Sequence, residues 1–386
     1  MQTKRRDHSD WYKKPGQVTD QRNVMKKIII VSILSGVLVG CGTNVTKEVI
    51  SDSVEDTFTN PLLERGADPW IFHHEGFYYY TNTMSRQIGI WRTRDITELR
   101  GAEYKTIYVP PENTMYSKQL WAPEIMNIND NWYVYFAADD GDNLNHKLYV
   151  LENTSDDPFE GEFKMKGKIQ TDEDDNWAID GSVFRHRGDY YFIWSGWRTS
   201  PYIEVEIQCI YIARMENPWR LATERVLISE PEYEWERIWK NPDEWNNTND
   251  HITFVNEGPE VLAHGDKLFL VYSASGCWTP YYALGMLTAD ADSDLLEPQS
   301  WTKHPEPVFH QSPQNGVYGT GHNCFFKSPD GSEDWILYHA NDRPEQGCGG
   351  RRSPRAQLIK WNDDGTPDFG IALSTSTRIK KPSGSK

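Results

Sequence analysis

The sequence predicts an all-β fold made of five similar units, and three observations lead to this prediction. Short alternating runs that are rich in aromatic residues begin near Asn60 and are broken by Gly, Asn and Asp. No long segment has the apolar spacing of an amphipathic helix. The pattern of strand-like runs then recurs five times, at spacings of 54 to 77 residues.

Each unit begins with a predicted hairpin. An apolar run follows the first residue of the unit, a turn comes about eight residues later, and an aromatic run follows the turn. Four of the turns contain glycine, which accepts the positive φ angles of tight hairpins. The first residues of the five units are Asp68, Ala122, Asp180, Glu257 and His322.

A further strand-like run follows each hairpin. These runs cover residues 88–95, 147–154, 209–216, 282–289 and 355–362. Five units of three or more strands are typical of radial blades, so we predict a five-bladed β-propeller over residues 60–375. A two-sheet sandwich whose strands are similar by coincidence is the alternative.

The N-terminal region has the pattern of an export signal. Residues 1–27 contain eight basic and three acidic groups, and the apolar run of 13 residues that follows, 28–40, is too short to span a membrane. The sequence Leu-Val-Gly-Cys at its end resembles the bacterial lipoprotein signal, in which the Cys receives a diacylglycerol. We therefore predict a lipoprotein-type signal peptide over residues 1–40 and lipidation of Cys41. A buried helix followed by an incidental Cys is the alternative.

Polar segments flank the predicted propeller. Residues 41–59 contain few large apolar groups, as expected of a flexible tether, and residues 376–386 form a polar tail. The expected protein is therefore exported and held at a bacterial membrane through its lipid, at the cell surface or in the periplasm.

The composition excludes two classes of protein. The 386 residues include 40 Lys or Arg and 57 Asp or Glu, a net charge of −17, which argues against binding to nucleic acid. A hydrophobic content of 38% excludes a polytopic membrane protein. Aromatic residues make up 13% of the chain; they favour strands, and Trp and Tyr provide flat surfaces that suit sugar rings.

Four cysteines remain besides Cys41: Cys209, Cys277, Cys324 and Cys348. Export permits disulfides, and four cysteines allow three pairings, while isolated buried thiols are the alternative. No C-x-x-C pair occurs, which argues against a zinc site.

Carboxylates stand at the first position of three units: Asp68, Asp180 and Glu257. In a propeller these positions converge at one end of the central channel. Burying several like charges together costs stability, so the matched positions indicate acid–base catalysis or metal binding. Acids that merely form turns at strand ends are the alternative.

Five motifs then resemble those of glycoside hydrolase family 43: GADPWI, LWAPEI, WAIDGSVF, NEGPEVL and GTGHN. The resemblance implies a five-bladed propeller and an inverting α-L-arabinofuranosidase, β-xylosidase or arabinanase. The stretches SASGCWTPYYALGML and YHANDR…RRSPRAQ are most similar to the exo-acting α-L-arabinofuranosidases, which act on arabinan or arabinoxylan side chains.

The resemblance also implies roles for the three acids. Asp68 matches the general base that deprotonates water, and Glu257 matches the general acid that protonates the leaving oxygen. Asp180 matches a third acid that orients Glu257 and keeps its pKa high by repulsion between like charges. Glu260 is the competing candidate for the acid, but it lies inside the predicted strand rather than at its mouth.

The resemblance further implies a calcium ion on the channel axis, near His322 and coordinated mostly by water. A His ligand is unusual for calcium, which prefers oxygen. A buried His that is hydrogen-bonded inside the channel is the alternative.

For sugar binding we expect Trp121, Trp91, Trp197 and Arg352. Trp121 is the best single candidate because its neighbours align with the acids, although any one Trp is more often part of a core. Arg351 and Arg355 lie in the same region as Arg352, from which the family supplies an Arg to the sugar pocket.

The expected function is the release of terminal α-L-arabinofuranosyl residues from arabinan or arabinoxylan. The alternatives are a β-xylosidase of the same family and a non-catalytic glycan-binding lipoprotein. A binding protein would not need three acids in register, and all three are present.

Overall fold

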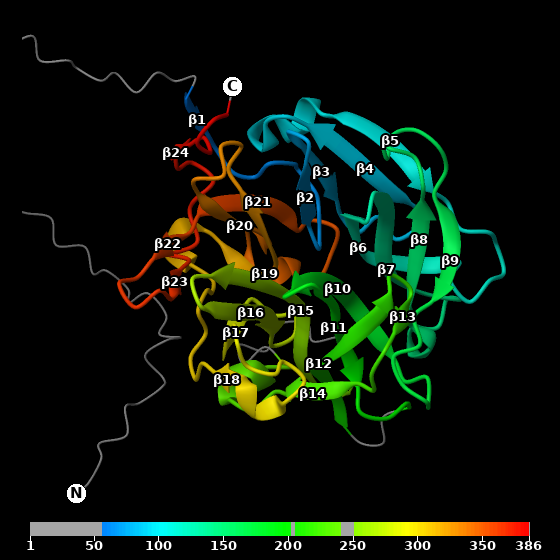
Figure 1. Cartoon of the computed structure of the whole chain (residues 1–386). Helices are drawn as coiled ribbons and strands as arrows, with labels where there is room; N and C mark the ends of the chain where they lie inside the picture. Colours follow the sequence, from blue (N-terminus) through cyan, green and yellow to red (C-terminus); the bar gives the residue numbers. More distant parts are fainter. Residues whose placement is uncertain (1–55, 202–204, 241–250, 386) are drawn as a thin grey trace, which may run out of the picture. The chain divides into compact units, whose positions relative to one another are not determined.

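The computed structural model describes residues 56–201, 205–240 and 251–385, and in these residues the regular secondary structure consists mostly of β-strands (Figure 1). The all-β prediction is therefore confirmed. The predicted signal peptide, Cys41 and nearly all of the tether lie outside the described residues. Among the described residues, no helix has the length and apolar character needed to cross a membrane.

Most strands fall into five consecutive antiparallel groups, one for each unit seen in the sequence. The first two groups are β2 (Trp70–His74), β3 (Phe77–Thr81), β4 (Ile88–Thr93) and β5 (Glu103–Tyr108), then β6 (Lys118–Ile128), β7 (Asn131–Asp139), β8 (Lys147–Asn153) and β9 (Lys164–Lys168). The third is β10 (Ala178–His186), β11 (Asp189–Trp197) and β12 (Val205–Asn217), with β13 (Arg220–Leu221) and β14 (Val226–Ser229) paired to β12. The last two are β15 (Ile252–His264), β16 (Lys267–Ala274), β17 (Ala283–Asp290) and β18 (Thr302–Lys303), then β19 (Tyr318–Lys327), β20 (Asp334–Asn341) and β21 (Ser353–Leu358).

Short 3₁₀ helices occupy several connections. They are η3 (Ile96–Gly101), η4 (Asn143–Asn145), η5 (Glu234–Arg237), η6 (Pro298–Ser300), η7 (Pro313–Asn315) and η8 (Pro344–Gln346). Their lengths of three to six residues agree with the lack of helical periodicity in the sequence.

The first strands of the five groups contact one another in a cycle (Figure 1). β2 contacts β6, β6 contacts β10, β10 contacts β15, β15 contacts β19, and β19 contacts β2. The third and fourth groups are also joined into one sheet, because β12 and β15 pair in parallel over Val205–Gln208 and Ile252–Val255. This parallel join was not expected from the sequence.

Each group has a residue in the left-handed backbone region at a matching position, just before β2 in the first group and inside β6, β10, β15 and β19 in the others. These residues have φ between 43° and 54°, and they are Asp68, Ala122, Asp180, Gly258 and His322. In β6, β10, β15 and β19 the strand pairing shifts register at this point. The equivalent position in the fourth group is therefore Gly258, and Glu257 lies one residue before it. The sequence pattern had placed Glu257 itself in register with the two aspartates.

The two ends of the described chain meet in a small sheet. In this sheet β1 (Thr57–Phe58) pairs with β24 (Ile379–Lys380). A separate two-stranded sheet is formed by β22 (Lys360–Trp361) and β23 (Pro367–Asp368). Phe58 packs on Trp335, with ring centroids 6.1 Å apart. Residues assigned to the tether and the tail thus form strands, because Phe58 and Ile379 bury apolar side chains.

The cysteines divide into one disulfide and two thiols within the described residues. Cys277 and Cys348 form the disulfide, which selects one of the pairings that the sequence left open. Cys209 and Cys324 are free and buried.

Candidate active site

Asp68 lies just before β2, and its carboxylate is enclosed by polar side chains. Its Oδ1 accepts a hydrogen bond from Arg352 Nη1 at 2.7 Å, and its Oδ2 accepts one from Thr83 Oγ1 at 2.7 Å. Nδ1 of His322 and Nδ1 of His339 each lie 3.4 Å from Oδ1. The residue is 8% exposed. A carboxylate held in this way is ionised and oriented.

The charges around Asp68 lower its pKa. Burial alone would raise it, but the Arg352 guanidinium and the Thr83 hydroxyl hold the pKa of this carboxyl well below its ordinary value. Asp68 therefore remains a carboxylate throughout the neutral and mildly acidic range, as a general base must.

His339 has a defined tautomer. The backbone N–H of Asp68 donates to His339 Nδ1 at 3.1 Å, so the ring proton of a neutral His339 must lie on Nε2. Burial and the nearby Arg352 hold the pKa of His339 well below its ordinary value, which keeps the ring neutral. Burial also lowers the pKa of His322, although the Asp68 charge opposes this.

Glu257 and Asp180 are two further carboxyls of the site, and they interact with each other. Tyr282 Oη donates to Glu257 Oε1 at 2.8 Å, and the backbone N–H of Gly258 donates to Asp180 Oδ2 at 3.0 Å. Asp180 thus holds the residue that directly follows Glu257. Gly258 has φ +53°, and a Cβ there would lie 3.2 Å from the His322 ring, so both the backbone and the space favour glycine.

The pKa shifts of this pair are opposite to that of Asp68. Burial, followed by the charges of Glu257 and Asp68, raises the pKa of Asp180 well above its ordinary value. Burial, assisted by the Asp68 charge, raises the pKa of Glu257 to about 7, although the Tyr282 hydrogen bond opposes the rise. Since the two groups interact, the pair holds a proton near neutral pH. One side of the site therefore provides a base, and the other an acid.

Glu260 lies in a different environment, together with Glu124. Burial and the charge of Glu260 raise the pKa of Glu124, and burial raises that of Glu260, which receives hydrogen bonds from the Phe325 backbone and Cys324. Within the described residues, the Oε2 atom of Glu124 and the Oε2 atom of Glu260 are each buried without a hydrogen-bond partner. Glu260 thus faces β19 inside the fold, and this position favours Glu257 as the acid.

Trp121 is part of an aromatic stack. Its half-buried ring lies on His146, with centroids 4.0 Å apart and planes at 27°. His146 meets Trp177 edge-on at 6.3 Å, and Trp177 stacks on Trp197 at 4.7 Å. Because buried rings support it from behind, the partly exposed Trp121 has the form of a rigid platform.

The two other predicted sugar contacts differ in burial. Trp197 is 1% exposed, so it supports Trp177 and does not offer an open face of its own. Trp91, in β4, is half-buried and packs against Tyr80 at 5.4 Å and Tyr104 at 4.6 Å. Trp197 thus fills the space between strands, whereas the sugar contact of Trp91 stays a prediction.

Among the three arginines, the structure distinguishes Arg352. Its guanidinium binds Asp68, with 13% of the side chain exposed. Arg355 is completely buried and pairs with Asp342 at 2.7 Å, while Arg351 is exposed. The predicted Arg352 is therefore the one that reaches the acids.

The side chains around His322 do not by themselves form a calcium site. Calcium takes six to eight oxygen ligands, whereas the Asp68 carboxylate beside His322 already binds the Arg352 guanidinium. In the part of the chain that the structure describes, no group of three or more His, Cys, Asp or Glu side chains is arranged to hold a metal ion. The calcium ion stays a prediction, and no step below depends on it.

Sequence reasoning missed three residues that contact the acids: Thr83, Tyr282 and His339. Thr83 follows the aromatic strand of the first hairpin, Tyr282 lies in the stretch SASGCWTPYYALGML, and His339 lies in YHANDR. The last two stretches supported the family resemblance, but nothing in the sequence indicated which side chain meets which acid. The contact between Tyr282 and Glu257 joins residues 25 positions apart, and that between His339 and Asp68 joins residues 271 apart.

The chain is similar to a known family over most of its length. The family model described as "Glycosyl hydrolases family 43" matches residues 58–367. An extracellular exo-α-(1→5)-L-arabinofuranosidase of Streptomyces avermitilis is 38% identical over 328 residues, which are 82% of this chain and 64% of that relative's length. A protein of the same name from Streptomyces chartreusis is 35% identical over 75% of this chain and 84% of its own.

A solved structure agrees with these similarities. The crystal structure of an α-L-arabinofuranosidase from Lactobacillus brevis superposes with a TM-score of 0.74 at 35% sequence identity, covering 83% of this chain and 98% of its own.

Proposed function

The chain belongs to glycosyl hydrolase family 43, and on this basis we propose that it is an inverting, exo-acting α-L-arabinofuranosidase. The proposed substrates are arabinan, arabinoxylan or their oligosaccharides, from which it releases terminal arabinofuranose. The names of the similar proteins from S. avermitilis, S. chartreusis and L. brevis support this choice of sugar.

One observation carries the proposal: the carboxyls of a single site have opposite pKa shifts. The pKa of Asp68 is held low, while that of Glu257 is raised to about 7. Glycoside hydrolysis with inversion requires this pair, a carboxylate that activates water and a carboxylic acid that protonates the leaving group.

In the proposed reaction, Asp68 accepts a proton from a water molecule as its oxygen attacks the anomeric carbon. The glycosidic C–O bond breaks, and the leaving oxygen takes the proton of Glu257. Asp68 ends protonated and Glu257 ionised, so exchange of one proton with solvent restores both groups. Because the water attacks from the face opposite the leaving group, the configuration inverts.

The neighbouring residues assist the two acids in this proposal. Arg352 and Thr83 orient the base through the hydrogen bonds described above. Asp180 holds the backbone beside the acid through Gly258 N–H. Trp121 provides a platform for a sugar ring. The binding energy of these groups serves to align water and substrate.

We also propose that the five antiparallel groups are the blades of a five-bladed β-propeller. The cycle of contacts among β2, β6, β10, β15 and β19 supports this arrangement. In such a fold the five matching left-handed residues would surround one channel.

Export and lipid anchoring remain proposals that rest on the pattern of residues 1–41. The similar Streptomyces proteins are named as extracellular, which agrees with export. Labelling of the expressed full chain with a radioactive fatty acid, and loss of the label in Cys41→Ala, would support the anchor. Equal labelling of both chains, or no labelling of either, would contradict it.

The proposed activity is tested with the Asp68→Asn and Glu257→Gln variants on α-1,5-linked arabino-oligosaccharides. Both variants should lose at least a thousandfold in kcat and retain the circular dichroism of the wild type, because they change one functional group each. Asp95→Asn is the matched control, since Asp95 is also buried and binds Lys381 at 3.0 Å. Residual hydrolysis within tenfold of the wild type would refute the assignment of the acids. A 4-nitrophenyl β-D-xyloside tests the β-xylosidase alternative.

The calcium prediction has a separate test. If His322 binds calcium through water, dialysis against a chelator should lower the melting temperature and added calcium should restore it. An unchanged melting temperature and activity would rule calcium out as a component of this site.

A further inference from the structure

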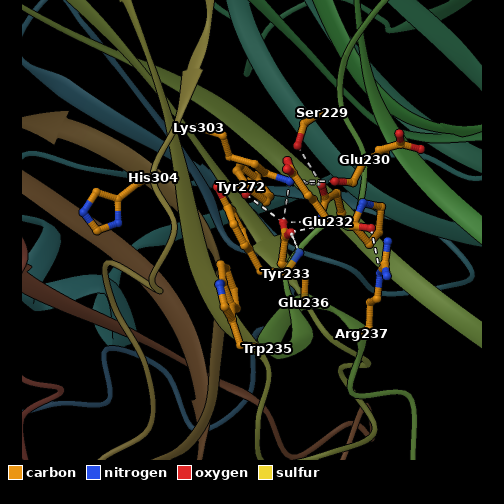
Figure 2. A network of polar contacts seen from close by, with 12 residues as sticks. Ser229, Glu230, Glu232, Tyr233, Trp235, Glu236, Arg237, Tyr272, Lys303 and His304 are labelled. Atoms are coloured by element: carbon orange, nitrogen blue, oxygen red, sulfur yellow. Dashed lines mark hydrogen bonds and ion pairs between the residues drawn. The ribbon is translucent and has the colours of Figure 1, made fainter. Parts of the chain in front are cut away.

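A buried carboxylate, Glu236, lies outside the three acids and forms the centre of a polar network (Figure 2). Its side chain is in η5 and has no exposed surface. The carboxylate accepts five hydrogen bonds or ion-pair contacts, which come from Lys303 Nζ (2.7 Å), Tyr272 Oη (2.8 Å) and Asn256 Nδ2 (3.0 Å) on Oε1 and from the backbone N–H groups of Glu232 (2.7 Å) and Tyr233 (2.8 Å) on Oε2.

This network reaches the acid through Asn256, the residue immediately before Glu257. Asn256 donates to Glu236, and its Oδ1 accepts from Ser229 Oγ at 2.7 Å and from Lys303 Nζ at 3.4 Å. Its backbone carbonyl accepts from Ser195 Oγ at 2.9 Å. Asn256 is completely buried, so all of these contacts are shielded from water.

Glu257 is therefore held from both sides. Asn256 is fastened to Glu236 on one side, and the N–H of Gly258 is fastened to Asp180 on the other. β15 pairs in register with β16 at Asn256 and Glu257, opposite Ala274 and Ser273, but the register shifts directly after Glu257, so the ladder is interrupted at Gly258. Side-chain hydrogen bonds therefore supplement the ladder at Asn256 and replace it at Gly258.

We infer that Glu236, neutralised by Lys303, is a positioning residue for the general acid, because it fixes the Asn256 side chain and through it the backbone that carries Glu257. This inference rests on the proposed function, since it assigns the network to the acid step of that reaction.

The energetics favour this role over simple stabilisation. Removing a carboxylate and an ammonium from water costs free energy for each ion, and apolar side chains of similar volume often stabilise a fold as well or better. A network in which every acceptor position on Glu236 is used does specify one geometry. An acid that must deliver a proton to one oxygen needs such a geometry.

The experiment compares Glu236→Gln and Asn256→Ala with the wild type on two substrates that differ in their need for the acid. The sugar leaving group of α-1,5-arabinobiose must be protonated, whereas 4-nitrophenolate leaves with little help. We expect kcat on arabinobiose to fall at least tenfold with KM within twofold. We expect kcat on 4-nitrophenyl α-L-arabinofuranoside to fall less than threefold.

Glu152→Gln is the matched control. Glu152, in β8, also accepts from a Tyr hydroxyl and a Lys ammonium, Tyr133 at 3.0 Å and Lys166 at 2.7 Å, but is not connected to the acids by any of these contacts. Its variant should alter both substrates by less than twofold.

Three outcomes decide the inference. Equal losses on the two substrates in both variants would overturn it, because a structural role lowers the fraction of active enzyme for every substrate alike. Activities unchanged on both substrates would also overturn it. A wild-type protein that releases no arabinose from either substrate would instead refute the proposed function. If Glu236→Gln does not fold, Asn256→Ala alone gives the comparison, because it leaves Glu236 and Lys303 paired.

Discussion

Replacing Tyr282 by Phe should move the alkaline limb of the pH profile upward. The Tyr282 hydroxyl donates to Glu257 Oε1 at 2.8 Å, and this hydrogen bond favours the ionised carboxylate and so lowers the pKa of Glu257. Removing the donor raises that pKa. Since Glu257 must be protonated to act as the acid, kcat/KM then persists to higher pH.

The size of the shift follows from the strength of the bond. A hydrogen bond to a charged group contributes about 1.5–3 kcal/mol, and one pKa unit corresponds to about 1.4 kcal/mol. The Glu257 pKa of about 7 should therefore rise by about 1–2 units. Because Asp180 shares the proton of the pair, the lower end of this range is the expected value.

The assay is kcat/KM on α-1,5-arabinobiose between pH 4 and pH 10. The alkaline limb should move upward in Tyr282→Phe, while the acidic side of the profile should not change, because Asp68 stays ionised down to pH 4. Tyr338→Phe is the control, because Tyr338 is equally buried but donates to Gln357, at 3.1 Å. An alkaline limb that stays in place or moves to lower pH would refute the reasoning.

Three further changes have defined outcomes. Arg352→Met should raise the pKa of Asp68, because Arg352 lowers it, and so move the acidic limb of kcat/KM upward; an unmoved limb would argue against the contact. Glu257→Gln should stabilise the protein at pH 8 by about 1–3 kcal/mol relative to the wild type but little at pH 4.5. The reason is that the folded wild type loses stability as the pH rises from 4.5, the ordinary pKa of a Glu, through about 7, where Glu257 ionises in the folded state. Urea unfolding at the two pH values measures this difference, and an equal effect at both would contradict it. Replacing Cys277 and Cys348 by Ser should lower the free energy of unfolding by about 2–4 kcal/mol, because the disulfide closes a loop of 71 residues; an unchanged urea midpoint would show that the crosslink adds no stability.

The repeated pattern in the sequence predicted the strands well, because each hairpin is a local structure. The predicted run 88–95 became β4 (Ile88–Thr93), and the run 147–154 became β8 (Lys147–Asn153). Alternation of apolar residues and the turn residues between strands decide such elements over a few positions. The parallel join of β12 to β15 and the pairing of β1 with β24 could not be predicted, because they depend on contacts between distant segments.

The site shows the same division. The motifs identified Asp68, Asp180 and Glu257, and the structure brings these three acids together, but the one-residue offset of Glu257 from the left-handed Gly258 appeared only in the backbone. Trp197 looked like a sugar contact because of its position near the acids, yet its ring is buried behind Trp177. Burial of this kind depends on which side chains from other strands lie opposite.

By itself, the sequence determined the family, the all-β fold and the identity of the candidate acids, because these depend on residue type and local spacing. Only the tertiary structure decided which partners set the charges that the resemblance implied. Asp68 is buried and Glu257 is half-buried, and their pKa values diverge because Arg352 meets one and mainly desolvation and Asp68's charge act on the other. Those partners come from residues 284 and 189 positions away in the chain, and electrostatic interaction depends on distance in space.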